Sequence, residues 1–384
     1  MRLLSFIIAG LIFQNLIAAS YIEDQIKKLE NYKLIVLERS KLFLNTEKVV
    51  CQNLSLSLGE CYPDMSKLRS LLMIKGYLLD EKIKDDYLFD DSLKNAVEHF
   101  QKQNRMNVTG VLDTKTCKIL NQSFDDEISM INKNIKRLES LKCSLQNNQK
   151  TVLINVPQYN LLCIDGDCVE KEINVIVGRP GRETNLKQDQ ILAIQINPSW
   201  TIPEGILKDK IKTFSKNPNY LDKNGYSVLD EDGDELEPNS IDWNQVRKNP
   251  TLYRFKQNPG KKNALGLYKF VLNNPENIHI HGTNQQNLFN KENRSISSGC
   301  IRVEDPKEFA KWLLKGQKEQ ICRIHSDNLK QDCLEKVFTK QIQKKSTQRI
   351  RLKNPVRVLF SYITMWIDEH DRVFKSDPYG KDLA

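Results

Sequence analysis

Two short stretches, Ile278-His279-Ile280-His281-Gly282-Thr283 and Ser297-Ser298-Gly299-Cys300-Ile301-Arg302-Val303, set the interpretation of the whole chain. In the first stretch isoleucine and histidine alternate, which predicts a β-strand that presents both histidines on one face. In the second stretch small residues form a tight loop directly before Cys300. A thiol becomes a good nucleophile only as a thiolate, which requires a nearby base or a positive field. We therefore predict that Cys300 is a nucleophile and that one of the two histidines is its base.

The residues around Cys300 add two further functional predictions. Backbone N–H groups of the loop could face a developing oxyanion, and such donors are worth about 3 to 4 kcal/mol. Arg302 is suited to clamping a substrate carboxylate. The structural alternative is that Cys300 is a small buried hydrophobe and that the histidines are core residues. The coincidence of a thiol, two histidines and a glycine-containing loop favours catalysis.

The chain has nine cysteines, an odd number: Cys51, Cys61, Cys117, Cys143, Cys163, Cys168, Cys300, Cys322 and Cys333. In an exported protein an even set predicts disulfides, and a cysteine left over is a candidate reactive thiol. Proximity in the sequence predicts the pairs Cys51–Cys61, Cys163–Cys168 and Cys322–Cys333, which leaves Cys117 with Cys143. Cys300 is then the residue left over. No CxxC pair or His/Cys cluster has the spacing of metal ligands, so no metal is predicted.

Residues 1–20 have the composition of an export signal. Arg2 supplies a positive charge, an apolar run from Leu3 to Phe13 follows, and Ala18-Ala19-Ser20 suits cleavage. An uncleaved anchor is the alternative, although the run is short for spanning a bilayer. No other stretch is apolar enough to span, so the mature chain is predicted to be soluble and non-cytosolic. The net charge of +9 could attract an anionic polymer, but its spread over many lysines favours simple solvation, and no pattern suggests nucleic acid.

With the signal at 1–20 as the first part, apolar periodicity divides the chain into five parts. We expect a helical segment at 21–62, a compact three-helix domain at 63–122, a connecting helix at 123–149 and a mostly β domain at 150–384. A helical insertion is expected within the β domain at about 200–255. Its acidic run Asp230–Glu235 lacks the ligand spacing of a calcium loop, and a solvated hairpin tip is the better interpretation. The predicted fold class is a mostly β domain plus a small all-α domain.

The three-helix segment resembles the peptidoglycan-binding domain of cell-wall enzymes. The resemblance lies in three motifs, which begin at Leu72, Phe89 and Thr109: L-x-x-x-G-Y, F-D-x-x-L-x-x-x-V-x-x-F-Q and T-G-x-x-D. Most of these residues are core positions, so the motifs argue for the fold more than for a ligand.

The β domain resembles the YkuD-type L,D-transpeptidase catalytic domain, in its large branch with a capping insertion. Beyond the two stretches quoted first, the resemblance includes Asn197–Pro203, Gln257–Gly260 and Glu304-Asp305-Pro306. It implies a β-sandwich or barrel-like fold, no cofactor, and a peptidoglycan stem peptide as both acyl donor and acceptor. A carbapenem is implied as a covalent ligand of the cysteine. The implied location is the periplasm; the oligomeric state is left open.

The family pattern also implies roles for individual residues. The base maps onto His281, with the carbonyl of Gly282 orienting it, and the N–H groups of Gly299 and Cys300 form the oxyanion hole. Three further residues are assigned to substrate binding: Arg302, His279 and Ser298. His279 is the second candidate for the base. Ser298 stands where many members have histidine, and a loop hydrogen bond or oxyanion support are both compatible with it.

The implied reaction is acyl transfer through a thioester on Cys300, which gives a 3→3 crosslink between two stems. Two enzymatic alternatives are an L,D-carboxypeptidase that hydrolyses the same bond and a ligase that attaches a lipoprotein to peptidoglycan. A non-catalytic wall-binding protein is the alternative from a different class. A papain-like or NlpC-type peptidase is disfavoured, because those families place the cysteine before the histidine.

Overall fold

The computed structural model describes residues 18–79, 87–104, 106–145, 149–166, 168–217, 219–274, 278–316, 333–344 and 346–382. The chain forms two compact units, Ser144–Tyr362 and, from two separate segments, Tyr21–Cys143 with Ile363–Ala384. Most of the predicted export signal, residues 1–17, lies outside the described residues. Within the described ranges, no helix has the length and apolar character needed to cross a membrane.

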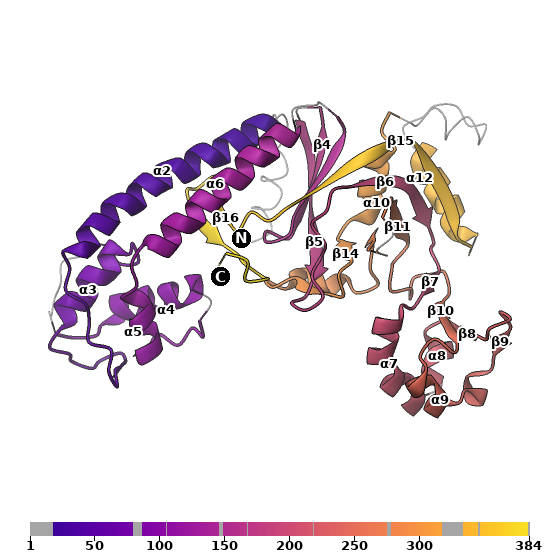
Figure 1. The fold of residues 1–384 in the computed structure, drawn as a ribbon, viewed down its shortest axis with the longest axis horizontal. Helices are drawn as coiled ribbons and strands as arrows, with labels where there is room; N and C mark the ends of the chain where they lie inside the picture. The colour runs from indigo at the N-terminus through magenta and orange to yellow at the C-terminus, as the bar shows by residue number, and fades with distance from the viewer. Residues whose placement is uncertain are drawn as a thin grey trace. The chain divides into compact units, whose positions relative to one another are not determined.

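The helical unit contains two long helices, α2 (Ala18–Leu44) and α6 (Asp125–Leu145). An ion pair between Glu23 and Lys142 and a hydrogen bond from Tyr32 to Glu127 show that they lie side by side and run antiparallel (Figure 1). Both helices carry one buried apolar face, as amphipathic helices of a folded unit do.

Three shorter helices make up the predicted peptidoglycan-binding segment: α3 (Met65–Ile74), α4 (Asp91–Gln103) and α5 (Thr114–Leu120). The motif residues have structural roles here. Asp90 caps α4 by accepting from the N–H of Leu93, and Asp113 caps α5 by accepting from that of Thr116. The buried amide of Gln101 accepts from the N–H groups of Thr109 and Gly110.

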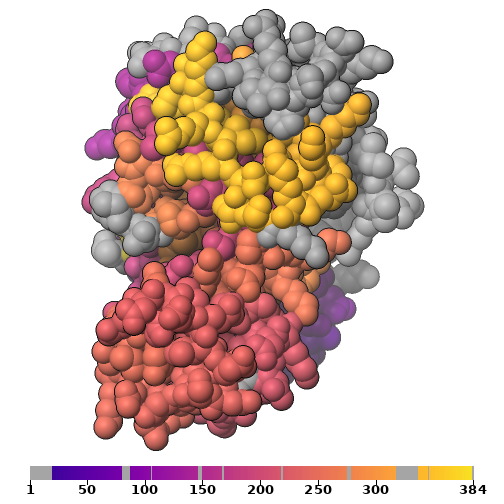
Figure 2. Space-filling view, turned by 90° about the vertical axis from the view of Figure 1, so that its right-hand side faces the viewer, coloured from indigo at the N-terminus to yellow at the C-terminus, as the bar shows by residue number. Residues whose placement is uncertain are grey.

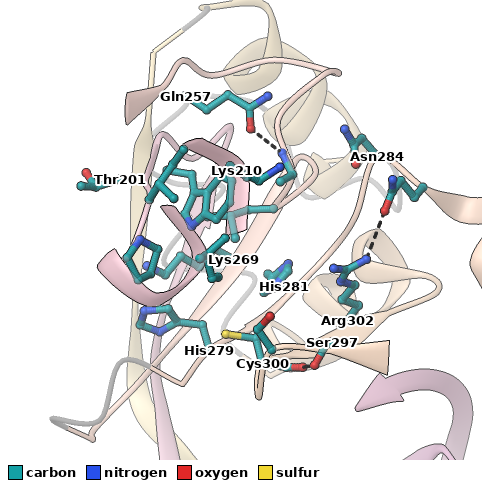
Figure 3. Close-up of a pocket in the computed structure, with 18 of the residues that line it drawn as sticks. Thr201, Lys210, Gln257, Lys269, His279, His281, Asn284, Ser297, Cys300 and Arg302 are labelled. Carbon is teal, nitrogen blue, oxygen red and sulfur yellow. Dashed lines mark hydrogen bonds between the residues drawn. The ribbon is translucent and has the colours of Figure 1, made fainter. Parts of the chain in front are cut away.

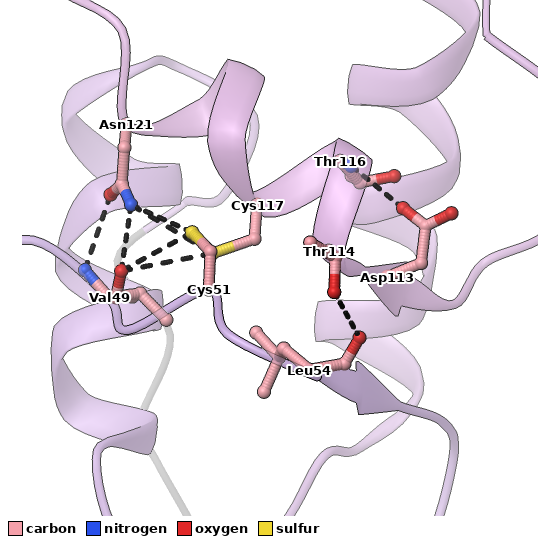
Figure 4. The surroundings of a disulfide bond; sticks show 8 residues. All are labelled: Val49, Cys51, Leu54, Asp113, Thr114, Thr116, Cys117 and Asn121. Carbon is pink, nitrogen blue, oxygen red and sulfur yellow. Dashed lines mark hydrogen bonds between the residues drawn. A yellow bond between two sulfur atoms is a disulfide. The ribbon is translucent and has the colours of Figure 1, made fainter.

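A disulfide between Cys51 and Cys117 links the chain after α2 to helix α5 (Figure 4). Short strands β1 (Ser55–Leu56) and β2 (Leu112–Asp113) pair with each other and bring these two regions together. The prediction of a disulfide is therefore confirmed, and this bond is consistent with an extracytoplasmic location.

Three of the four predicted cysteine pairs are wrong. Cys61 and Cys143 are exposed thiols, so neither Cys51–Cys61 nor Cys117–Cys143 forms. Cys163 and Cys168 also remain thiols, because the register of their hairpin sets Cys163 opposite Lys171 and Cys168 opposite Asp165. The predicted bond from Cys322 to Cys333 involves a residue, Cys322, outside the described ranges. Nearness in sequence is a poor guide, because tertiary contacts decide which sulfurs meet.

The C-terminal segment packs within the helical unit. Strands β16 (Met365–Ile367) and β17 (Val373–Lys375) form a hairpin. Gln25 on α2 hydrogen bonds to the main chain of Ile367, and Asn134 on α6 bonds to Thr364. Sequence resemblance assigns this segment to the catalytic domain, whereas its contacts in the structure are with α2 and α6.

The second unit is a β-barrel. Strand pairing closes a ring of eight strands in the order β5, β14, β12, β11, β6, β15, β3, β4 and back to β5. Their bounds are β3 Thr151–Asn155, β4 Asn160–Asp165, β5 Cys168–Gly178, β6 Asp189–Ile196, β11 Tyr268–Leu272, β12 Ile280–His281, β14 Ile301–Val303 and β15 Gln348–Ser361. A ninth strand, β13 (Ser295–Ser297), pairs with the end of β5. Closure removes the exposed sheet edges that open sheets carry. Helices α10 (Pro306–Leu313) and α12 (Cys333–Gln343) follow the barrel strands that carry the site.

Residues 200–257 form an insertion with a core of its own. It contains a four-stranded sheet and three helices: β7 Trp200–Thr201, α7 Glu204–Lys216, α8 Asn219–Lys223, β8 Tyr226–Leu229, β9 Glu235–Leu236, α9 Trp243–Lys248 and β10 Arg254–Gln257. Phe214, Phe255 and Leu221 are buried at its centre. The acidic run joins β8 to β9, and Asp230 accepts from the N–H groups of Gly233 and Asp234. Figure 2 shows the insertion, in salmon, as a lobe below the barrel.

Candidate active site

A cavity of about 810 Å³ lies between the insertion and the barrel. The barrel contributes residues of β11, β12 and β14, and the insertion contributes residues of β7 and α7. Five of the seven predicted site residues line it: Cys300, His281, His279, Arg302 and Ser298. The two predicted glycines, Gly282 and Gly299, are chain neighbours of these residues. The structure thus brings the predicted constellation together (Figure 3).

Cys300 stands in the loop that joins β13 to β14. Gly299 has a φ of +108°, a conformation that only glycine adopts without strain, so the glycine before the cysteine is required by the loop geometry. The carbonyl of Gly299 accepts a hydrogen bond of 2.9 Å from the Thr184 hydroxyl, which in turn accepts from the N–H of Gly178. The loop is therefore held by the end of β5 and the turn after it.

Ser297 braces the same loop from inside. Its hydroxyl donates to the carbonyl of Cys300 at 2.6 Å and accepts from the N–H of Gly299 at 3.2 Å. Sequence reasoning missed both Ser297 and Thr184. The Ser-Ser pair before Gly299 was the available signal for Ser297; nothing local marked Thr184, because it lies 116 residues before Cys300.

His281 ends β12 and is only 5% exposed. Its Nδ1 lies 2.5 Å from the carbonyl oxygen of Gly282. Because a carbonyl oxygen only accepts, Nδ1 must carry the proton, which leaves the Nε2 lone pair as the basic site. Burial, with smaller contributions from the charge of Arg302 and other nearby cations, lowers the pKa of His281 to about 3. The imidazole is therefore neutral at neutral pH, as a general base must be.

His279 directly precedes β12, and its carbonyl accepts a hydrogen bond from the N–H of Ile301. Its Nδ1 is buried and has no hydrogen-bond partner among the described residues. Burial, followed by the nearby charge of Lys269, lowers the pKa of His279 to about 4. Both histidines are thus neutral bases in this environment.

Burial raises the pKa of the Cys300 thiol. A backbone hydrogen bond from His279 and the charges of Lys269 and Arg302 act in the opposite direction, and burial prevails. Burial therefore favours the uncharged forms of the Cys300 thiol and of both imidazoles.

Arg302 and Ser298 also line the cavity, and both are half-buried. Arg302 on β14 donates to Gln285 at 3.3 Å. The hydroxyl of Ser298 is approached by Arg179 at 3.5 Å and by Arg182 at 3.4 Å. Both arginines also form ion pairs with Asp209 on α7 of the insertion.

The two arginines were missed by sequence reasoning. The only local signal was the basic turn Arg179-Pro180-Gly181-Arg182, at the end of β5. Across the described ranges, no group of three or more His, Cys, Asp or Glu side chains is arranged to hold a metal ion.

Comparison with protein families gives two matches. Residues 149–321 match the family described as L,D-transpeptidase catalytic domain (YkuD), and residues 62–120 match "Putative peptidoglycan binding domain". A protein of Haemophilus influenzae named "Putative L,D-transpeptidase" is 35% identical over 234 residues, which are 60% of this chain and 44% of that protein. This chain therefore spans less than half of that relative.

Two further comparisons give a short match in sequence and a match in structure at low identity. The carboxy-terminal processing protease CtpB of Bacillus subtilis is 41% identical over 58 residues, 15% of this chain and 12% of that protein. The crystal structure of an L,D-transpeptidase from Stackebrandtia nassauensis aligns with 79% of this chain and 94% of its own, at 12% identity and a TM-score of 0.22.

Proposed function

We propose that this chain forms 3→3 crosslinks between peptidoglycan stems in the periplasm. The support from the comparisons is that residues 149–321 match the L,D-transpeptidase catalytic domain family and residues 62–120 match a peptidoglycan-binding family. The observation that carries the proposal is the cavity in which Cys300 and the neutral, Nδ1-protonated His281 lie together. The predicted export signal and the Cys51–Cys117 disulfide support a compartment outside the cytoplasm.

In the first half of the proposed reaction, His281 Nε2 takes the proton of the Cys300 thiol. The sulfur attacks the L-centre carbonyl of diaminopimelate in a tetrapeptide stem, and the carbonyl oxygen becomes an oxyanion. The amide bond to D-alanine then breaks, D-alanine leaves with the proton from His281, and a thioester remains on Cys300.

In the second half, the amine of a neighbouring stem attacks the thioester. His281 takes the amine proton and returns it to the departing sulfur, which restores the Cys300 thiol. The N–H of Cys300 is a candidate oxyanion donor. The N–H of Gly299, the second candidate, donates to Ser297 in this structure and would have to change partner during the reaction.

Purified tetrapeptide stems test the proposal. We expect incubation with the full chain to yield stem dimers and released D-alanine, detected by mass. Release of D-alanine with only monomeric tripeptide would contradict the transferase and favour the L,D-carboxypeptidase. If Cys300→Ala gave the same products as the unaltered protein, the non-catalytic wall-binding alternative would be favoured.

A carbapenem supplies an independent measurement. We expect one covalent adduct, located at Cys300 by peptide mapping, and a much slower addition in His281→Ala. Cys61 and Cys143 are exposed thiols and act as internal controls for non-specific reaction.

A further inference from the structure

The hydroxyl of Thr184 connects the loop before Cys300 to the end of β5. It donates to the carbonyl of Gly299 at 2.9 Å and accepts from the N–H of Gly178 at 2.9 Å. Thr184 is only 1% exposed, whereas Cys300 lines the cavity. Thr184 therefore contacts the loop from its buried side, and any effect of its hydroxyl on the reaction must pass through the loop.

The turn that carries Thr184 packs closely against this loop. A methyl group added at Gly178 would lie 2.2 Å from the carbonyl oxygen of Arg182, so the turn folds back onto β5 only because residue 178 is glycine. A methyl group added at Gly299 would lie 3.6 Å from the carbonyl oxygen of Glu183, an ordinary van der Waals contact. The backbone of the turn thus lies directly beside the loop, where the threonine hydroxyl reaches its carbonyl.

The Thr184 hydrogen bond fixes the orientation of the peptide between Gly299 and Cys300. This peptide is trans and planar, so its C=O and its N–H point in opposite directions. Because the carbonyl of Gly299 is directed at the buried threonine, the N–H of Cys300 is directed away from it.

Neighbouring polar groups of the main chain are held by other partners. The N–H of Gly299 donates to the Ser297 hydroxyl at 3.2 Å, and the carbonyl of Cys300 accepts from the same hydroxyl at 2.6 Å. The N–H of Ile301 donates to the carbonyl of His279 at 2.9 Å. The direction of the Cys300 N–H is therefore the one that depends on the threonine.

We propose that Thr184 is a positioning residue for acyl transfer. By holding the plane of the Gly299–Cys300 peptide, its hydroxyl aims the Cys300 N–H at the oxygen of the carbonyl that the Cys300 sulfur attacks. This inference rests on the proposed function, because that oxygen becomes an oxyanion only when sulfur adds to a carbonyl.

The role follows from where charge develops in this step. The bond from sulfur to the carbonyl carbon forms, the π electrons of the carbonyl move to its oxygen, and the thiol proton passes to His281. A donor that is already aimed at the oxygen stabilises the new charge without rearrangement. A peptide plane released by loss of the Thr184 hydroxyl would have to be reoriented at the same moment.

Two reagents that modify Cys300 separate this role from a merely structural one. A carbapenem acylates the sulfur through attack on its β-lactam carbonyl, whose oxygen becomes an oxyanion. Iodoacetamide alkylates the same sulfur by displacement of iodide, and no oxyanion forms. Both rates are measured on the full chain at one pH, by intact mass and peptide mapping.

Thr184→Val removes the hydroxyl and keeps a side chain of similar shape. We expect carbapenem addition at Cys300 to slow by about tenfold to a hundredfold, part of the cost of losing an oxyanion donor outright. Iodoacetamide alkylation should be unchanged. Thr184→Ser keeps the hydroxyl and should restore the carbapenem rate. Thr151→Val is the matched control: it removes another buried hydroxyl of the barrel, which bonds to the carbonyl of Gln149, and should change neither rate.

Thr184→Ala also lacks the hydroxyl and repeats the comparison with a side chain too small to clash. Equal slowing of both reactions in the two variants would overturn the inference, because the hydroxyl would then control access to the thiol. Alkylation of Cys300 as fast as that of exposed Cys61 would also overturn it, because the hydroxyl would then hold the whole loop rather than one donor.

An unchanged carbapenem rate in Thr184→Val, or a slow rate in Thr184→Ser, would contradict the inference as well. The proposed function fails differently: the unaltered protein would form no stem dimer from tetrapeptide stems, whatever the ratio of the two modification rates.

Discussion

At the scale of single residues, the surroundings of Cys300 favour a neutral resting pair. Burial raises the pKa of the thiol and lowers that of His281 to about 3, so neither group is charged at neutral pH. In the proposed reaction the thiolate would therefore form only as His281 takes the proton of Cys300 during the attack. The neutral pair could not be predicted from the sequence, because it depends on the depth of burial of both side chains.

This arrangement predicts the pH dependence of alkylation at Cys300. Iodoacetamide should react about tenfold faster per pH unit from pH 6 to 9, because the pKa of the thiol lies above its usual value. The rate should show no inflection near 6.5, because His281 stays neutral down to about pH 3. Peptide mapping measures the rate at each cysteine. A plateau below pH 7 at Cys300 would instead indicate a thiolate–imidazolium pair.

The Ser297 hydroxyl predicts a second effect at this scale. Ser297→Ala removes its bonds to the Cys300 carbonyl and the Gly299 N–H, each worth about 0.5 to 1.5 kcal/mol. Carbapenem addition to Ser297→Ala, measured by intact mass, should be about tenfold slower than to the unaltered protein. Ser295→Ala is the matched control on the same strand, since its buried hydroxyl donates only to Asn293. Equal slowing in both variants would assign the effect to strand β13 as a whole.

At the scale of elements, the insertion is a small folding unit within the catalytic half. Its four-stranded sheet and helices enclose a core that includes Phe214, Phe255 and Leu221. A helical insertion at about 200–255 was predicted because this part of the sequence has helical patterns and is rich in asparagine and proline. The four-stranded sheet was missed because β7 and β9 are two residues long, which is too short for a recognisable alternation.

The insertion core predicts a local loss of stability in Phe214→Ala. Truncation of this fully buried ring should cost about 3 to 5 kcal/mol. Hydrogen exchange measured by mass spectrometry should accelerate over the insertion and remain slow in β3 and β15. Uniform acceleration through the barrel would show that the two parts unfold together.

At the scale of the whole molecule, the chain leaves the helical unit after Cys143 and returns to it at Ile363. Arg137 on α6 forms an ion pair with the buried carboxylate of Asp382. This ion pair holds the C-terminal segment, which begins at Ile363, against α6. The helical unit is therefore assembled from both ends of the described chain, and its disulfide lies in the first of these segments.

The Cys51–Cys117 bond predicts a large stability effect confined to that unit. The two residues are 66 apart in sequence, and loop-closure entropy for this length gives about 4 kcal/mol. Cys51→Ser with Cys117→Ser should lower the denaturant midpoint of the helical unit, and reductant should lower it in the unaltered protein only. Carbapenem addition at Cys300 should be unchanged. A slower addition would show that the helical unit influences the catalytic domain.

Local order along the chain was sufficient to single out Cys300, Arg302 and the pair His279 and His281, because strand alternation and a glycine before the cysteine are short-range features. The choice of His281 over His279 as the base came from the family resemblance. Local order was also sufficient for the two domain resemblances, whose motifs are made of core and capping residues. The disulfide partner of Cys51 and the hydroxyl of Thr184 depend on the tertiary structure. These residues are far from their partners in sequence: folding of the helical unit brings Cys51 to Cys117, and folding of the barrel brings Thr184 to the carbonyl of Gly299.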